Sequence, residues 1–179
     1  MGRFDTPPSG TFLSNDDWGF ESNCFVCERT NEAGLRIPFY ADEAAGRVTA
    51  RFTLGGAFSG APSFVHGGVT MAVLDEAQAW ATIALGGKFA VTTETTTRFR
   101  RPVMVDGTYE VQARLTDQGD TTIRTAAEVR DEADEVCAAT TATFVVLSEA
   151  VARTAIGDDI GGAALGFVRD GGDEPRSAS

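Results

Sequence analysis

Alternating hydrophobic and polar residues, the spacing of β-strands, recur in several segments of the chain. Residues 35–40 and 47–53 show this spacing, and the turn residues at 44–46 predict that the two segments form a hairpin. Four more strands are predicted farther along the chain, at residues 89–99, 108–116, 121–129 and 136–147. Because short links join these later strands, we expect an antiparallel sheet of about six strands.

One long segment between the strands does not alternate. The run VHGGVTMAVLDEAQAWATIAL is rich in Ala, Leu and Met, and it predicts a helix from Gly67 or Gly68 to about Leu85. Apolar residues occur on nearly every side of this helix, so other structure must surround it. The pattern therefore predicts an α+β fold, with a curled antiparallel sheet wrapped around one central helix.

The 179 residues fit one domain of ordinary size. Residues 1–23 contain two prolines and no periodicity, so we expect an arm, followed by the domain itself at 24–157. A short helix is predicted near the end of the domain, at 148–157. Residues 158–179 end in the polar run DGGDEPRSAS and are expected to be a flexible tail.

Charge and cysteine content narrow the class of protein. A formal net charge of −11 repels phosphate backbones, which excludes nucleic acid as a partner. Three cysteines do not suit a disulfide framework and favour a reducing compartment. Without a signal-peptide pattern or an apolar run long enough to span a membrane, we expect a cytoplasmic protein with no membrane partner.

Two adjacent carboxylates, Asp75 and Glu76, fall in the middle of the predicted helix. A carboxylate in an apolar setting is costly unless it is paired, and no Lys or Arg lies three or four residues away. Such a group is a candidate general base or nucleophile. The alternative is that Glu76 points to solvent and Asp75 bonds a neighbouring strand.

The same helix begins at His66, Gly67 and Gly68. The first N–H groups of a helix have no internal partner, and two glycines leave them unshielded, so they can hold the oxyanion of a thioester. A Gly-Gly pair alone is more often a simple turn, and a single histidine there is more often a capping or packing residue.

The spacing between these groups constrains the geometry. Asp75 lies seven residues after Gly68, on the same helix face but about 10 Å farther along the axis. One carbonyl cannot contact both groups. If two copies pack their helices antiparallel about a twofold axis, the Asp75 of one chain lies beside the Gly67 of the other.

These segments resemble hotdog-fold acyl-CoA thioesterases, of the branch that includes the phenylacetate-pathway thioesterases. The resemblance rests on VHGGVTMAVLDEA at 65–77, CFVCERTNEAGL at 24–35 and RFRRPV at 98–103. It implies hydrolysis of an acyl-CoA without a cofactor, since coenzyme A is part of the substrate. It also implies a homodimer, with a dimer of dimers as a further possibility.

The resemblance assigns roles to individual residues. The Gly67 N–H would polarise the thioester carbonyl, His66 would shape the pocket, and Asp75 of the partner chain would be the base or nucleophile. Thr92, nine residues before an Arg-Pro step, would orient the water or the carboxylate. Some relatives use glutamate on this helix, so Glu76 competes with Asp75 and is placed, with Gly68, among the substrate-binding residues.

Two further features have competing interpretations. Cys24 and Cys27 form a CxxC motif, but without a second pair of ligands we expect two small buried thiols and no metal. Arg98, Arg100 and Arg101 stand out in an acidic chain as a candidate clamp for the phosphates of coenzyme A, against the alternative of a solvated sheet surface.

Three functions fit the sequence to different degrees. Hydrolysis of an acyl-CoA is the leading hypothesis, and a non-catalytic acyl-CoA sensor or binding protein is the alternative, because a fold does not determine a function. Retention of Asp75 argues against a sensor. A hotdog dehydratase would need a catalytic histidine after the helix, whereas His66 precedes it.

Overall fold

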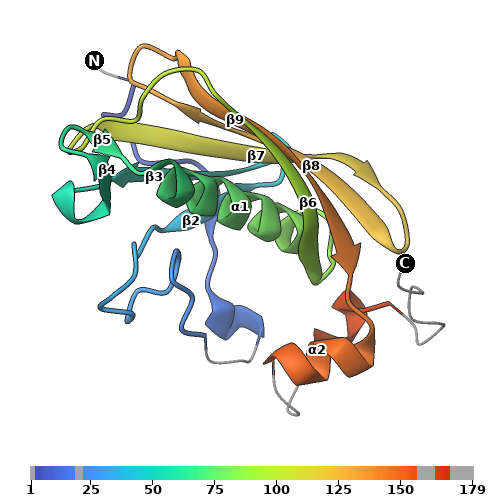
Figure 1. Cartoon of the computed structure of the whole chain (residues 1–179). Helices are drawn as coiled ribbons and strands as arrows, with labels where there is room; N and C mark the ends of the chain where they lie inside the picture. Colours follow the sequence, from blue (N-terminus) through green and yellow to red (C-terminus); the bar gives the residue numbers. More distant parts are fainter. Residues whose placement is uncertain (1–2, 19–21, 157–163, 170–179) are drawn as a thin grey trace, which may run out of the picture.

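The computed structural model describes residues 3–18, 22–156 and 164–169, and it shows an antiparallel sheet curled around one long helix, α1 (Figure 1). Within these residues the main sheet has seven strands in the order β1-β2-β3-β7-β8-β9-β6. Their bounds are β1 Thr11–Phe12, β2 Phe39–Asp42, β3 Arg47–Thr53, β6 Ala90–Phe99, β7 Thr108–Gln118, β8 Thr122–Arg130 and β9 Val136–Val146. The predicted α+β class and wrapped helix are confirmed.

Along the central strands of the sheet, every second residue is buried. In β8, Ile123, Thr125, Ala127 and Val129 are buried, while the residues between them are more exposed. The neighbours β7 and β9 both pair antiparallel with β8, and β7 also pairs with β3. The inward-facing side chains of these strands form the core that packs on α1.

The helix α1 spans Gly67–Ala84, close to the predicted bounds. Its residues Val73, Ala77 and Ala81 are fully buried, and the buried Gln78 donates a hydrogen bond to Thr125 of β8 at 2.8 Å. The helix ends where the Gly87 backbone adopts φ +62°, a conformation that glycine accepts without strain. The apolar positions on most sides of the helix are thus explained by the surrounding sheet.

The first predicted strand, 35–40, is displaced toward its C-terminal end. The N–H groups of Leu35 and Ile37 donate to the carbonyls of Phe25 and Val26, so this backbone is tied to the preceding loop and not to a sheet. Pro38 has no N–H to donate. For these reasons β2 begins only at Phe39. Shorter elements outside the prediction are η1 Asn15–Trp18, η2 Gly56–Phe58, β4 Ser59–Ala61 and β5 Phe64–Val65.

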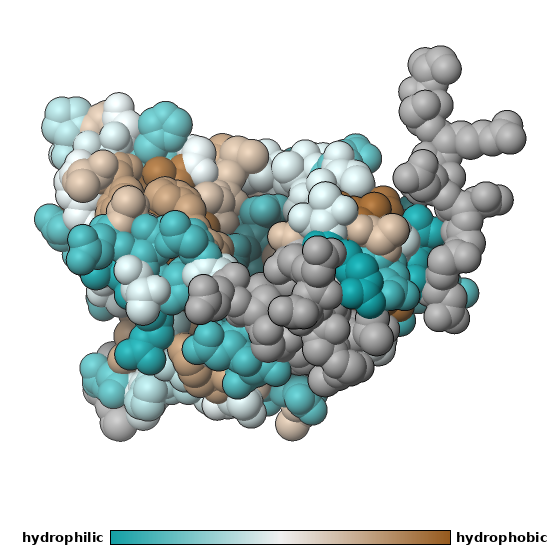
Figure 2. All heavy atoms as spheres, turned by 90° about the horizontal axis from the view of Figure 1, so that it is seen from below, coloured by the Kyte–Doolittle hydropathy of each residue, from teal (hydrophilic) through white to brown (hydrophobic). Residues whose placement is uncertain are grey.

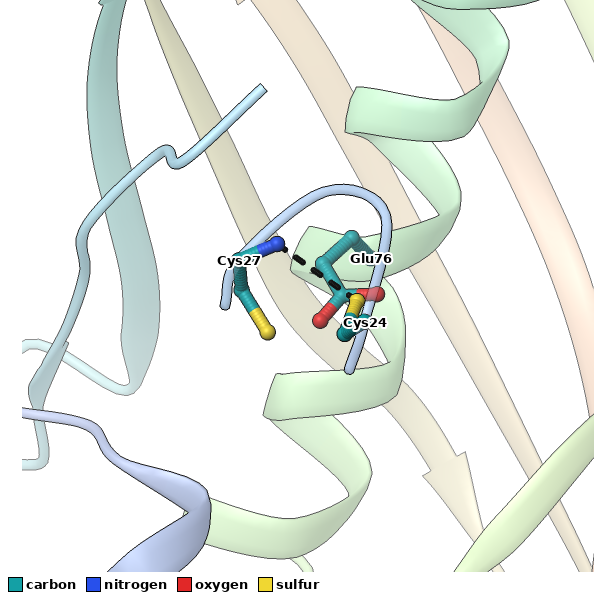
Figure 3. A group of neighbouring side chains, drawn as sticks. All are labelled: Cys24, Cys27 and Glu76. Atoms are coloured by element: carbon teal, nitrogen blue, oxygen red, sulfur yellow. Dashed lines mark hydrogen bonds between the residues drawn. The ribbon is translucent and has the colours of Figure 1, made fainter. Parts of the chain in front are cut away.

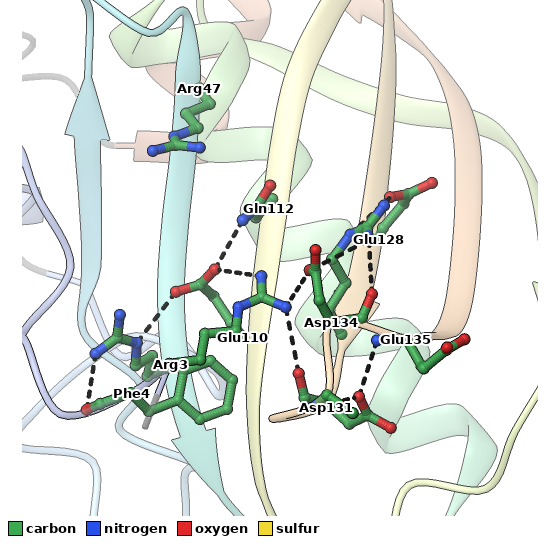
Figure 4. A network of polar contacts seen from close by, with 12 residues as sticks. Arg3, Phe4, Arg47, Glu110, Gln112, Glu128, Asp131, Asp134 and Glu135 are labelled. Carbon is green, nitrogen blue, oxygen red and sulfur yellow. Dashed lines mark hydrogen bonds and ion pairs between the residues drawn. The ribbon is translucent and has the colours of Figure 1, made fainter. Parts of the chain in front are cut away.

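The N-terminal arm lies against the sheet. Its strand β1 pairs with β2 at the sheet edge, and Arg3 reaches the carboxylate of Glu110 on β7 at 3.1 Å. Arg51 of β3 contacts the other oxygen of Glu110, also at 3.1 Å, and donates to the carbonyl of Phe4 (Figure 4). Charge pairing around one partly enclosed carboxylate therefore fastens the arm.

The chain after β9 forms the predicted short helix, α2, at Glu149–Ile156. Farther on, η3 (Ala164–Phe167) returns to the domain, where the Phe89 N–H donates to the Phe167 carbonyl and the Arg169 N–H to the Leu147 carbonyl. Residues 158–163 and 170–179 of the predicted tail lie outside the described residues, and the domain boundaries stay a prediction. No helix in the described ranges has the length and apolar character needed to cross a membrane.

Candidate functional site

His66 caps the start of α1. Its Nδ1 accepts the Gly68 N–H at 2.9 Å, and its carbonyl accepts the N–H groups of Val69 and Thr70. The interpretation of His66 as a capping residue is therefore correct, while its catalytic role stays a prediction. Among the described residues, the Gly67 N–H has no acceptor, so it alone of the glycine pair is free to polarise a carbonyl.

The hairpin β4–β5 fixes the His66 ring. A Cβ atom added to Gly60 of β4 would lie 3.0 Å from Cδ2 of His66, which shows how closely the hairpin backbone approaches the imidazole. The His66 N–H also donates to the Phe58 carbonyl at 2.8 Å. The loop predicted between the second strand and the helix is thus built to hold the helix start.

Asp75 lies beside β6. The Thr92 hydroxyl donates a hydrogen bond to Oδ1 of Asp75 at 2.7 Å, so the structure brings together these two residues, which are 17 positions apart. Asp75 is exposed in the single chain, and the expectation that it is buried is wrong. The wrapping sheet leaves this side of α1 open, because β6 is the last strand of the sheet.

Glu76 is the carboxylate that is enclosed. It lies beside the loop of Cys24 and Cys27 (Figure 3), so the alternative is wrong in turning Glu76 to solvent. The other half of that alternative, a bond from Asp75 to a neighbouring strand, is confirmed by the hydrogen bond from Thr92. Burial raises the pKa of Glu76 to about 8, and the neighbouring Cys24 adds to the rise. No salt bridge among the described residues involves Glu76.

The two cysteines are distinct in their surroundings. Cys24 Sγ accepts the N–H groups of Val26 at 3.3 Å and Cys27 at 3.4 Å. A hydrogen bond from the Cys27 thiol, assisted by these N–H groups and opposed by burial, lowers the pKa of Cys24 to about 5. The same thiol contact, together with burial and the charge of Glu76, raises the pKa of Cys27. These contacts therefore favour the thiolate form of Cys24 over that of Cys27.

Sequence reasoning missed this cluster because its members are far apart in the chain. The CxxC motif and the unexplained carboxylate were both visible, but they were assigned separately. Helix geometry gives the one signal that points to the cluster. Glu76 is rotated by about 100° around α1 from Asp75, so the two carboxylates must face different neighbours.

Apolar side chains are exposed beside Asp75. Phe99 of β6 is 53% exposed, and Met71, one turn before Asp75 on α1, is 36% exposed. Val91 of β6 is 47% exposed, but it points to the sheet face opposite that of Thr92. The Phe99 ring also lies 3.5 Å from where a Cβ of Gly67 would be. Apolar patches alternate with polar surface when the molecule is viewed from below (Figure 2). The uncovered side of α1 is thus bordered by Phe99 of an edge strand and by Met71 of the helix itself.

The three predicted arginines do not form one cluster. Arg98 and Arg100 line a shallow groove of about 220 Å³ together with Arg114, which the sequence argument did not consider. By strand alternation this groove is on the sheet face turned away from α1. Arg101 instead pairs with Glu135 at 3.1 Å, both exposed. The clamp for coenzyme A stays a prediction.

Comparisons with known proteins agree with this fold. Residues 63–138 match the sequence model of the thioesterase superfamily. A thioesterase superfamily protein of known crystal structure shares 29% identity at a TM-score of 0.60; the match covers 64% of this chain and 56% of that protein, little more than half its length. A search of curated proteins gave no match.

Two bacterial structures add detail. A Ralstonia eutropha JMP134 protein, described as a thioesterase related to phenylacetic acid degradation, shares 27% identity at a TM-score of 0.56, over 63% of this chain and 86% of that one. A Streptococcus mutans UA159 protein solved with acetyl CoA shares 22% identity at a TM-score of 0.54, over 56% and 81%. The predicted resemblance to hotdog-fold thioesterases is confirmed.

Proposed function

We propose that this hotdog-fold protein hydrolyses an acyl-CoA to the free acid and coenzyme A, at a site shared by two chains. The observation that carries the proposal is the 2.7 Å hydrogen bond from Thr92 to Asp75 on the open side of α1. It holds a carboxylate in one orientation, next to an edge strand and on the same helix as the free Gly67 N–H.

The proposed chemistry follows from this arrangement. Because Thr92 donates to one carboxylate oxygen, the other oxygen of Asp75 is free to take a proton from water. The water oxygen then attacks the thioester carbonyl carbon, the C–S bond breaks, and coenzyme A leaves as a thiolate that takes up a proton. Direct attack by Asp75, forming an anhydride that water cleaves, uses the same geometry.

The oxyanion formed in that step needs a donor. The Gly67 N–H is such a donor, at the positive end of the helix dipole. Along the helix axis it lies about 12 Å from Asp75, too far for one carbonyl to contact both. The donor and the base must therefore come from different chains.

The edge strand β6 supports a second copy. It has ten residues, pairs on one side with β9, and exposes Val91 and Phe99. A long exposed edge of this kind favours pairing with another strand. Antiparallel pairing of two β6 strands about a twofold axis would set the two α1 helices antiparallel and cover Asp75. The exposure of Asp75 in one chain fits a site that a partner completes.

The comparisons support the substrate class. The thioesterase superfamily match includes the helix and β6, and the Streptococcus mutans protein of this fold binds acetyl CoA. We extend coenzyme A recognition to this chain as part of the proposal, with Arg100 as a candidate contact for its phosphates.

A hydrolysis screen tests the proposal. The purified protein is incubated with short, long and aromatic acyl-CoAs, and released thiol is measured with and without a chelator. We expect turnover of at least one substrate, unaffected by the chelator. Binding without turnover across the panel would replace hydrolysis by the acyl-CoA sensor function.

A further inference from the structure

Cys24, Cys27 and Glu76 form a compact set of metal-binding side chains. Each residue offers one ligand atom, and these three atoms all lie within 4.8 Å of one another (Figure 3). The set joins two elements that are distant in sequence, the loop at 24–27 and the middle of α1. All three residues are partly buried, so the groups are shielded without being closed off.

The loop at 24–27 directs hydrogen-bond donors at its cysteine sulfur atoms. Two successive backbone N–H groups point at Cys24 Sγ, and the Asn15 side-chain amide donates to Cys27 Sγ at 3.7 Å. Donors directed at sulfur stabilise the deprotonated form that binds metals. The loop itself is held by Asn31, whose amide donates to the Asn23 and Cys24 carbonyls.

The spacing fits a tetrahedral ion. With zinc–sulfur bonds of about 2.3 Å, two sulfur ligands of one zinc lie about 3.8 Å apart. The observed limit of 4.8 Å requires only a small inward movement of the side chains. Two thiolates and a carboxylate suit zinc and similar ions, and they do not suit magnesium or calcium, which prefer oxygen ligands alone.

A fourth ligand can reach the site. Cys27 lines a cavity of about 460 Å³ together with Asn15, Asp16 and Trp80, so water has access to this side of the cluster. We propose that Cys24, Cys27 and Glu76 bind a zinc-class dication, with water as the fourth ligand. This goes beyond thioester hydrolysis, because Glu76 faces a different neighbour from Asp75, about 100° around α1.

The ion would stabilise the fold and take no part in hydrolysis. It would join the loop at 24–35 to α1. The Phe25 and Val26 carbonyls of this loop already accept the N–H groups of Leu35 and Ile37. The two proposals can therefore fail separately, since metal binding is measured by affinity and hydrolysis by turnover.

Metal titration of the intact, reduced chain tests the site. The protein is stripped with a chelator and titrated with Zn²⁺ by calorimetry and with Co²⁺ by absorption. We expect about one equivalent of Zn²⁺ per chain, and with Co²⁺ a thiolate-to-metal absorption band. Absence of a stoichiometric binding event in the folded wild-type protein would overturn the proposal, without any variant being needed.

Variants assign the ligands. Cys24→Ser and Cys27→Ser should lose the absorption band, and Glu76→Gln should weaken Zn²⁺ binding at least tenfold, as measured by competition with a chelator. Cys137→Ala, at the third cysteine, should bind as the wild type does. Retention of binding in both serine variants would contradict the assignment. So would a Cys24–Cys27 disulfide that forms in air while the reduced protein binds no Zn²⁺.

Discussion

Two sides of α1 place their carboxylates in different surroundings. On the β6 side, Asp75 is exposed and accepts a hydrogen bond from one hydroxyl, and the exposed apolar side chains on this side are Phe99 and Met71. On the loop side, Glu76 is enclosed and faces two thiols. Adjacent positions on a helix differ by about 100°, so neighbouring residues in sequence acquire unrelated surroundings. The chemistry of each carboxylate depends on the element that faces it.

The largest expected effect is on catalysis. Asp75→Asn should lower kcat about 100-fold or more with little change in KM, because it removes a base and keeps the contact with Thr92. Glu76→Gln, on the other side of the helix, should change kcat by less than about tenfold. Steady-state kinetics on the best acyl-CoA of the screen measures both, and a reversed order would mean that Glu76 is the reacting carboxylate.

The next effect is on stability and concerns the loop side alone. Zn²⁺ at 100 times its dissociation constant should stabilise the wild-type fold by about 2.7 kcal/mol, which raises the melting temperature by several degrees. Glu76→Gln should lose most of that rise, while Asp75→Asn should keep it. If zinc raised the melting temperature of all three proteins equally, the ion would be bound elsewhere.

A third carboxylate, Glu110, sharpens the contrast with Glu76. Burial alone would raise the pKa of Glu110, but hydrogen bonds from Gln112 and Arg51 and the charges of Arg3 and Arg51 lower it. The ionised form is thus favoured in the folded state. Its contribution to stability is present above its ordinary pKa of 4.5 and is lost as the pH falls through the lowered value.

The corresponding variant is Glu110→Gln. It should reduce the free energy of unfolding by about 2 kcal/mol at pH 7, since Arg3 and Arg51 lose their shared partner. Urea denaturation at several pH values should show the difference from wild type shrinking as the pH is lowered below 4.5. A difference that is constant with pH would mean that the ion pairs do not contribute.

The smallest effect concerns coenzyme A. Arg100→Ala should raise KM for acyl-CoA about threefold and leave KM unchanged for a truncated thioester without the nucleotide phosphates. Arg124→Ala is the matched control, because Arg124 is an exposed strand arginine already paired with Asp117 at 3.1 Å. Equal changes in KM for both substrates would favour the solvated-surface interpretation.

The strands and the helix were predictable because burial on one face imposes a period that the sequence records. The error at 35–40 arose from hydrogen bonds to a distant loop, which alternation does not reveal. The short strand β1 was also missed, since two residues carry no period. Its pairing with β2 depends on where the arm returns to the sheet.

The site was predictable where one helix carries both groups. The spacing of Gly67 and Asp75 follows from helix geometry, and the partner Thr92 came from the family resemblance. The exposure of Asp75 was not predictable, because it depends on which strand ends the sheet. Likewise, the contact of Glu76 with Cys27 and Cys24 depends on tertiary packing, which joins residues 49 and 52 positions apart.

The central claim is that each active site uses two chains, and mixed refolding tests it most directly. Gly67→Val shields the donor N–H with a side chain. The fold should tolerate this change, since an added Cβ would lie 3.5 Å from the Phe99 ring, an ordinary contact distance. Asp75→Asn spoils the base. Each variant alone should be nearly inactive. After unfolding and refolding together, about half of the dimers should be mixed, each with one intact site, which predicts recovery of about a quarter of wild-type activity. Absence of recovery despite confirmed mixing would show that one chain supplies both groups, and would contradict the shared site.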